Sequence, residues 1–300
     1  MSEEAGGRMS EETQEPMSEE TGQPMAEETE EPMGDHDAHP GYDSAHRGQT
    51  FRRQDLTGAV FDDTYLVGAR FKNVALKGAK ITGSQVVDVD ITGEVERLTV
   101  NGVDVTGFVE AELDRREPDR TKMRPRTPAE FREAWDILER RWADTFERAR
   151  RLDPALLHER VDGEWSFIET QRHLVFATDS WIRRALLGDP SPWSPLDLPH
   201  DDMADLPEVP RDQSVRPSLD EVVELRRDRM STMREVVDRL TDEQLEARTT
   251  PVPEPGYPES RDFPVADVVG CIVNEEWYHH QYAIRDLAVL ESAGHAEPDL

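Results

Sequence analysis

A large apolar residue returns at every fifth position between residues 51 and 91. This period fits neither the 3.6-residue turn of an α-helix nor the two-residue alternation of a β-strand. The large residues are Phe51, Leu56, Phe61, Leu66, Phe71, Leu76, Ile81, Val86 and Ile91, and mostly small residues stand two positions before them. A repeat this regular predicts a solenoid, in which successive units stack on one another and the large side chains point inward.

The individual units resemble the pentapeptide-repeat family, as in the segments LTGAV, FDDTY, LVGAR and LKGAK. The resemblance implies a right-handed β-helix with roughly four units in each coil. Such a rod would have only about two coils here, which is too short to imitate a DNA duplex. Its role is therefore not predicted from the repeat alone.

Changes in composition divide the chain into successive parts. Residues 1–40 form an octad repeat with thirteen acidic side chains and the single base Arg8, a composition typical of disorder. We predict a disordered acidic tail (1–47), a pentapeptide solenoid (48–108), a linker (109–126), a helical domain (127–292) and a C-terminal tail (293–300). The pair Asn101-Gly102, between apolar residues of period two, predicts a hairpin or a solenoid cap.

Four long helices are predicted in the helical domain. Three begin with a capping box, in which a hydroxyl residue precedes a glutamate by three positions, at Thr127, Ser166 and Ser218. The fourth runs from Pro264 to Leu290. Long proline-rich connections separate the second helix from the third and the third from the fourth. The predicted fold is thus multidomain, with a β-solenoid followed by an all-α four-helix bundle.

Two side chains that are not apolar lie on the apolar stripe of the fourth helix. The stripe includes Ile272 and Ala283, and Glu276 and His280 fall between them at helical spacing. A buried carboxylate costs several kcal/mol unless it is paired, protonated or bound to a cation. His173, on the second helix, can face this pair across a bundle, and together the three supply N and O ligands for a metal. The predicted ligands are His173, Glu276 and His280.

Glu275 and His279 have the same spacing as the predicted pair. They lie one step round the helix, beside Tyr282 and Asp286, on a more polar face. The prediction therefore takes Glu276 and His280 first, with Glu275 and His279 as the alternative.

Two segments, EWSFIETQRHLVF (164–176) and NEEWYHHQYAIRDL (274–287), resemble the DinB-like (DinB/YfiT) superfamily of metal-binding four-helix bundles. In that family, one histidine of the second helix and two histidines four apart on the last helix bind a divalent metal. His173 and His280 match this pattern, and Glu276 replaces a histidine. The resemblance implies Zn, Ni, Fe or Mn, and the harder carboxylate oxygen favours Fe or Mn.

Several members of the family are S-transferases that use low-molecular-weight thiols such as mycothiol or bacillithiol. The resemblance therefore implies a metal-dependent enzyme that transfers a mycothiol-type thiol to small electrophiles. The alternatives are a non-catalytic interaction module with a vestigial metal site and a mycothiol-dependent isomerase of the maleylpyruvate type. Cys271 is predicted to be a poor nucleophile, and Trp165, Trp181 and Trp277 are predicted to be core residues.

The net charge of -30 argues against nucleic acid or an anionic membrane as a partner, since both require clustered Lys and Arg. The single cysteine excludes an internal disulfide, and the start MSEE has no signal-peptide pattern. No apolar run reaches the roughly 18 residues of a membrane span. We expect a cytoplasmic protein with a small-molecule substrate, and exposed solenoid ends favour a homodimer.

Overall fold

The structure is a computed structural model, and it describes residues 42–201 and 203–294. The chain divides into two compact units, Met1–Val89 and Asp90–Leu300, which are described separately below. The predicted acidic tail up to residue 41 and the end of the predicted C-terminal tail lie outside the described residues.

The pentapeptide repeat appears in the backbone as a corner at every fifth residue. The third residue of each unit has a positive φ, for example +80° at Gly58, +46° at Asp63 and +53° at Asn73. Glycine adopts this conformation without a steric penalty, and Asn and Asp tolerate it better than other residues. At alternate corners a turn closes with a backbone hydrogen bond, such as the 2.9 Å bond from Ala59 N to Leu56 O. The five-residue period is therefore a period of turns.

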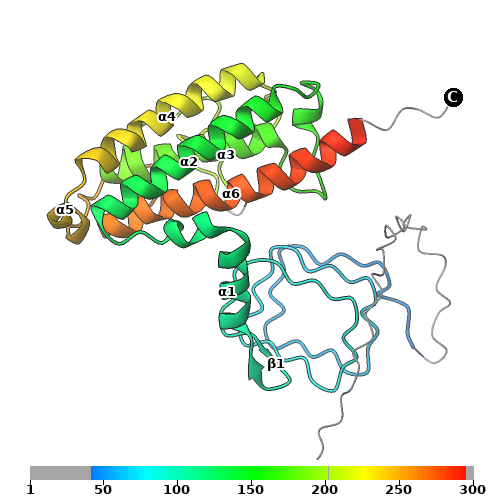
Figure 1. The fold of residues 1–300 in the computed structure, drawn as a ribbon. Helices are drawn as coiled ribbons and strands as arrows, with labels where there is room; N and C mark the ends of the chain where they lie inside the picture. The colour runs from blue at the N-terminus through cyan, green and yellow to red at the C-terminus, as the bar shows by residue number, and fades with distance from the viewer. Residues whose placement is uncertain (1–41, 202, 295–300) are drawn as a thin grey trace, which may run out of the picture. The chain divides into compact units, whose positions relative to one another are not determined.

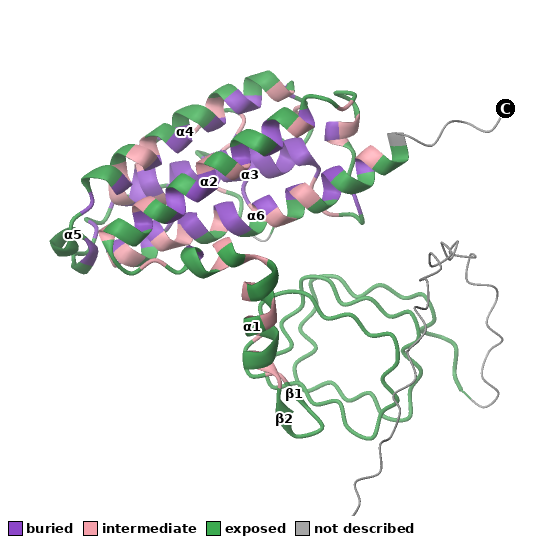
Figure 2. Ribbon diagram, in the orientation of Figure 1, coloured by how far each residue is buried: buried purple, intermediate pink, exposed green. Residues whose placement is uncertain are grey.

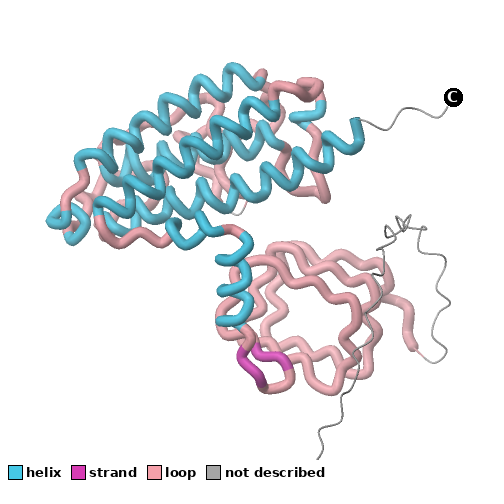
Figure 3. The backbone as a smooth tube through the Cα atoms, viewed as in Figure 1, coloured by secondary structure: helices cyan, strands magenta, loops and turns pink. Residues whose placement is uncertain are grey.

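The predicted β-ladder and filled interior are not seen in this unit. Residues 51–97 contain no strand, and their backbone hydrogen bonds are bonds within turns (Figure 3). The large apolar side chains stay exposed, from 45% at Leu66 to 75% at Ile81. Because no ladder between coils draws the described coils together, the apolar column does not form a packed core.

The second unit begins with the predicted hairpin. Strands β1 (Thr99–Val100) and β2 (Val103–Asp104) pair antiparallel, with Val100 opposite Val103. Asn101 and Gly102 both have positive φ, as a two-residue hairpin turn requires. The segment predicted as a linker is helical: α1 (Thr106–Arg116) is followed by a 3₁₀ helix, η1 (Pro118–Met123).

The rest of the chain is a helical bundle (Figure 1). Its elements are α2 (Pro128–Ala149), η2 (Leu156–His158), α3 (Phe167–Thr178), the π-helix η3 (Asp179–Leu186), α4 (Leu219–Arg239), α5 (Asp242–Glu246) and α6 (Val265–Gly294). The predicted capping boxes at Thr127, Ser166 and Ser218 are all present. The predicted helical region is confirmed, and the predicted second helix is divided into α3 and the π-helix η3.

Helices α2, α3, α4 and α6 bury a common core. Helices α2 and α3 each pack against both α4 and α6. Aromatic side chains of α2, including Trp135 and Trp142, are fully buried, and Figure 2 shows the buried faces turned toward one another. None of the helices in the described ranges combines the length and apolar content that a membrane crossing requires.

The long segment between η3 and α4 is fastened to α3 by a buried arginine. The Arg172 guanidinium donates hydrogen bonds to the carbonyl oxygens of Leu196 (2.9 Å), Asp212 (2.7 Å) and Val215 (3.2 Å). Because Arg172 is completely buried, these carbonyls satisfy donors that would otherwise be costly to bury. The segment is thereby held over the face of α3 that carries His173.

Candidate metal centre

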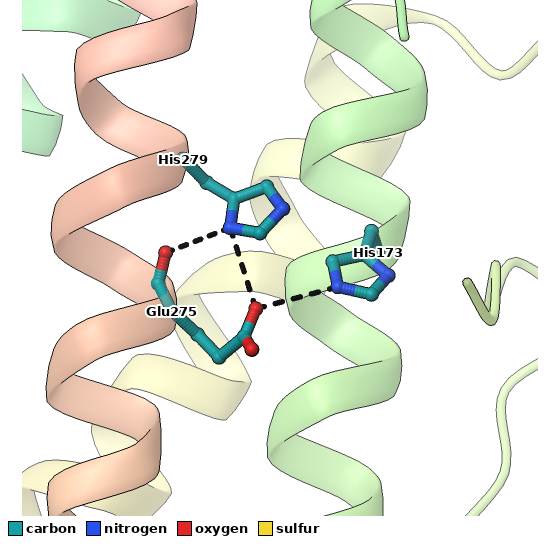
Figure 4. A group of neighbouring side chains, drawn as sticks. All are labelled: His173, Glu275 and His279. Atoms are coloured by element: carbon teal, nitrogen blue, oxygen red, sulfur yellow. Dashed lines mark hydrogen bonds and ion pairs between the residues drawn. The ribbon is translucent and has the colours of Figure 1, made fainter. Parts of the chain in front are cut away.

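Three side chains of the kinds that bind metals meet between α3 and α6. His173 comes from α3, and Glu275 and His279 lie one turn apart on α6 (Figure 4). One ligand atom from each residue lies within 4.8 Å of the others. The two imidazole rings stack with centroids 4.8 Å apart at 30°. Among the described residues, this is the group that satisfies the spacing of a three-ligand metal site.

The position of the proton on His173 follows from its backbone partner. Its Nδ1 lies 3.0 Å from the carbonyl oxygen of Leu198, which can only accept a hydrogen bond. In the neutral ring, Nδ1 therefore carries the proton and Nε2 presents a lone pair. Such a bond from the second ring nitrogen is the usual way in which proteins orient a metal-binding histidine.

The Glu275 carboxylate lies between the two rings and lacks a hydrogen-bond donor. Its Oε2 is 3.4 Å from His173 Nε2 and 3.3 Å from His279 Nδ1, yet this buried atom accepts no hydrogen bond within the described part of the chain. Burial favours the neutral acid, but a hydrogen bond from His173, in the state in which Nε2 of that ring carries a proton, and the nearby His279 hold the pKa of Glu275 below its usual value. When His173 is neutral with its proton on Nδ1, the carboxylate oxygen faces an imidazole lone pair, and a proton or a cation between them would relieve the repulsion.

His279 is held in a state suited to metal binding. Its Nδ1 lies 2.9 Å from the backbone oxygen of Glu275, so this nitrogen carries the ring proton and Nε2 is left with its lone pair. Burial, together with the neighbouring His173, lowers the pKa of His279 to about 4. The ring is therefore neutral at physiological pH, as a metal ligand must be.

The predicted ligand Glu276 lies elsewhere, in the interior of the bundle. Its carboxylate has 1% of its side-chain surface exposed, and its Oε2 accepts a 2.6 Å hydrogen bond from Arg226 Nη2. Burial raises the pKa of Glu276, although the Arg226 guanidinium acts in the opposite direction. The cation that neutralises this carboxylate is thus an arginine of α4.

His280, the other predicted ligand on α6, also faces the interior. Its Nε2 is 3.0 Å from Thr145 Oγ1 of α2, and its ring contacts Trp142 edge-on with centroids 5.0 Å apart. Burial, with a further contribution from Arg141, lowers the pKa of His280 to about 4. The structure therefore does not bring Glu276 and His280 together with His173, and the side chains that it groups with His173 are those of the alternative pair, Glu275 and His279.

The reason for the shift is that the most buried stripe of α6 is not the stripe that meets α3. Residues 276 and 280 point toward α2 and α4, whereas Glu275 and His279 lie at the edge of the core, with 32% and 18% of their side chains exposed. A signal for this was present in the helix over 219–239. Arg226 lies on its apolar stripe with Val222 and Met230, and a buried arginine needs acceptors for its N–H groups, which a buried carboxylate can supply.

Other predicted roles near the site have mixed outcomes. Burial raises the pKa of the Cys271 thiol to about 12, so the prediction of a poor nucleophile agrees with its surroundings. Trp277 is a core residue, with 3% exposure, and Trp181 packs on the edge of the core. Trp165 is not part of a core cluster among the described residues, and its ring contacts His173 with centroids 4.6 Å apart.

The side chains present suit a divalent metal. Two imidazole nitrogens and one carboxylate oxygen form a ligand set that leaves further coordination positions open. The 3.4 Å between His173 Nε2 and Glu275 Oε2 matches the separation of about 3.4 Å between two ligands, each about 2.1 Å from a tetrahedral ion. The unbonded, buried Oε2 is the atom whose charge an ion would neutralise.

Comparisons with known proteins agree with both resemblances. The model of the DinB superfamily matches residues 137–283, and the pentapeptide-repeat model matches residues 50–93 in eight copies. Comparison with curated proteins and with solved structures gives no significant match. The DinB match contains all three residues of the candidate metal centre. The helical part of this chain is thus similar to the DinB superfamily over residues 137–283, and the segment before it is similar to pentapeptide repeats over residues 50–93.

Proposed function

We propose that His173, Glu275 and His279 bind a divalent metal ion, and that the domain uses it to transfer a low-molecular-weight thiol to a small electrophile. The observation that carries the metal proposal is the Glu275 Oε2 atom, which is buried between two imidazoles without a hydrogen bond. Similarity to a superfamily whose members generally bind metals supports the same conclusion. Zn, Ni, Fe and Mn all accept this ligand set.

The choice of a thiol as the nucleophile rests on the resemblance of residues 164–176 and 274–287 to the thiol-using members of the family. A bound metal would act as a Lewis acid that lowers the pKa of the thiol toward neutrality. The thiol sulfur then forms a bond to the electrophilic carbon, the leaving group departs with the electrons of its bond, and the thiol proton passes to solvent.

The residues of the chain orient and shield this reaction. The Leu198 carbonyl fixes the His173 ring, and Arg172 holds the segment that carries Leu198. On the same side of His173, Phe176 is buried and stacks on Tyr257 with centroids 5.6 Å apart. The buried Phe176 would limit the access of water to His173, and the exposed part of the Glu275 side chain would leave room for a substrate.

Elemental analysis of the full chain, purified without an affinity tag, tests the metal proposal. We expect close to one equivalent of a divalent metal, and its loss on changing His173 or His279 to Ala. The enzymatic proposal is tested by incubating the metal-loaded protein with mycothiol and monobromobimane and measuring the thioether adduct. Stoichiometric metal without a metal-dependent adduct would favour the non-catalytic module over the transferase.

A further inference from the structure

Two aromatic side chains flank the candidate metal centre where it meets solvent. The Trp165 ring lies 4.6 Å from the His173 ring and 6.4 Å from the His279 ring, centroid to centroid, and is nearly parallel to the latter at 26°. The Tyr282 ring meets His279 from another direction, with centroids 6.0 Å apart at 78°. Trp165 and Tyr282 therefore bracket the imidazole of His279.

The backbone holds Trp165 in this position. A tight turn precedes it, with positive φ at Asp162 (+52°) and Gly163 (+71°) and a 2.9 Å hydrogen bond from Glu164 N to Val161 O. The next residue, Ser166, caps α3. Trp165 is thus fixed between a turn and the start of α3, with its ring in contact with the ring of His173.

Tyr282 is held by α6 and by a neighbouring cation. It follows His279 by three positions on the helix, which places the two side chains on one face. The Arg285 guanidinium lies over its ring, 5.5 Å from the centroid. Even so, 44% of Tyr282 is exposed. A tyrosine oriented in this way, with this much exposed surface, has room for a further ring contact.

The other aromatic residues around the centre differ because they are already used in packing. Phe176 is 2% exposed and stacks on Trp193 and Tyr257, and these three belong to one small cluster with Met203. Trp165 and Tyr282 belong to neither of the apolar clusters of the described chain. Packing of the core therefore does not account for their position beside the ligands.

We propose that Trp165 and Tyr282 form an aromatic clamp that selects substrates carrying a flat aromatic ring close to the atom that binds at the metal centre. The inference rests on the proposed metal site and specifies its substrate class. A substrate ring resting against both side chains, beside the His279 imidazole, would contact aromatic surface from each while its sulfur or oxygen donor reaches the ion. Aromatic contacts of this kind give a preference on the order of threefold to tenfold over an alkyl ligand of the same donor type.

The test compares two thiols on the Co(II)-loaded full-length protein. Phenylmethanethiol and ethanethiol share the same donor atom, and their binding is followed by the thiolate-to-cobalt charge-transfer absorption. We expect the wild-type protein to bind phenylmethanethiol about threefold to tenfold more tightly than ethanethiol. The preference should fall to about onefold to twofold in Tyr282→Ala and in Trp165→Ala, and it should persist in Tyr282→Phe, which keeps the ring.

Tyr278 provides the matched control. It lies one turn before Tyr282 on the same helix with nearly the same exposure, 43% against 44%, and has no ring contact with either imidazole in the described part of the chain. Tyr278→Ala should leave the preference unchanged. A wild-type protein that binds both thiols equally, or a preference that survives in both alanine variants, would overturn the clamp.

A metal-free measurement separates this inference from the proposed function. Saturation-transfer NMR on the metal-free protein should show contact with the aromatic protons of phenylmethanethiol, weakened in Tyr282→Ala and Trp165→Ala. If the protein takes up no Co(II) but this contact is present, the metal proposal fails and the clamp stands. If Co(II) binds but neither the thiol preference nor the NMR contact depends on the two aromatic residues, the clamp is wrong and the metal site stands.

Discussion

Arg226 of α4 and Glu276 of α6 form an ion pair in the centre of the helical bundle, with 0% and 1% of their side chains exposed and 2.6 Å between Nη2 and Oε2. The pair is cross-linked to α3, since Arg226 Nε also donates a hydrogen bond to Gln171 Oε1 at 3.2 Å. It joins three helices and sets which side of α6 faces the interior. Glu275 lies on the neighbouring side of α6, which faces α3.

Removing only the cation of this pair should destabilise the fold strongly. In Arg226→Met the Glu276 carboxylate stays buried without its partner, and we expect a loss of about 3–5 kcal/mol in the free energy of unfolding at neutral pH. The loss should shrink in acid, because burial already favours the protonated form of Glu276. Urea denaturation measures both effects. The double variant Arg226→Met, Glu276→Leu should recover most of the loss, and a double variant as unstable as the single one would contradict this account.

The two Glu–His pairs of α6 should respond differently in metal binding. Glu275→Gln should reduce the affinity for a divalent metal by at least an order of magnitude, since a charged ligand is lost, whereas Glu276→Gln should retain the wild-type stoichiometry. Isothermal titration of metal-free protein with Ni²⁺ provides the comparison. Equal losses in the two variants would mean that the ion does not lie on the Glu275 side.

Acid should weaken the metal-free fold through its buried histidines. The folded-state pKa of His280 is about 4, below the ordinary value of 6.5, so the unfolded chain takes up a proton at a higher pH than the folded chain. The stabilisation is complete above about pH 6.5 and is lost as the pH falls toward 4, by up to about 3 kcal/mol. His279 acts with the same sign. The free energy of unfolding, measured by urea denaturation between pH 4 and 7, should change less steeply with pH in His280→Gln than in the wild type. An identical pH dependence in the two proteins would refute this assignment.

A rise in pH from about 4 to 8 should weaken the fold through Asp197. This residue is completely buried, and burial together with the charge of Asp179 raises its pKa to about 8. The folded chain keeps this proton where the unfolded chain has lost it, so the stabilisation is full below about pH 4 and is lost as the pH rises to 8. Asp197→Asn cannot ionise, and its free energy of unfolding relative to wild type should rise with pH over this range. A pH-independent difference between the two proteins would show that Asp197 is ionised in the fold.

Much of the helical region could be predicted because its signals are local. The hydroxyls of Thr127, Ser166 and Ser218 bond to backbone amides three residues away, so each capping box is decided within a single turn. The Asn101-Gly102 hairpin turn is decided in the same way. The pentapeptide repeat predicted the period of the turns but not the exposure of the apolar column, because burial depends on contacts between coils.

The sequence by itself determined that α6 carries two carboxylate–histidine pairs at a spacing that suits a metal, and that His173 lies on a helix able to face them. Only the tertiary structure decided between the pairs. Both have identical spacing, so no local signal separates them, and the choice depends on the rotation of α6 about its axis. That rotation follows from packing against α2 and α4, where His280 is hydrogen-bonded to Thr145 and Glu276 is paired with Arg226. Glu275 and His279 then lie on the side of α6 that faces His173.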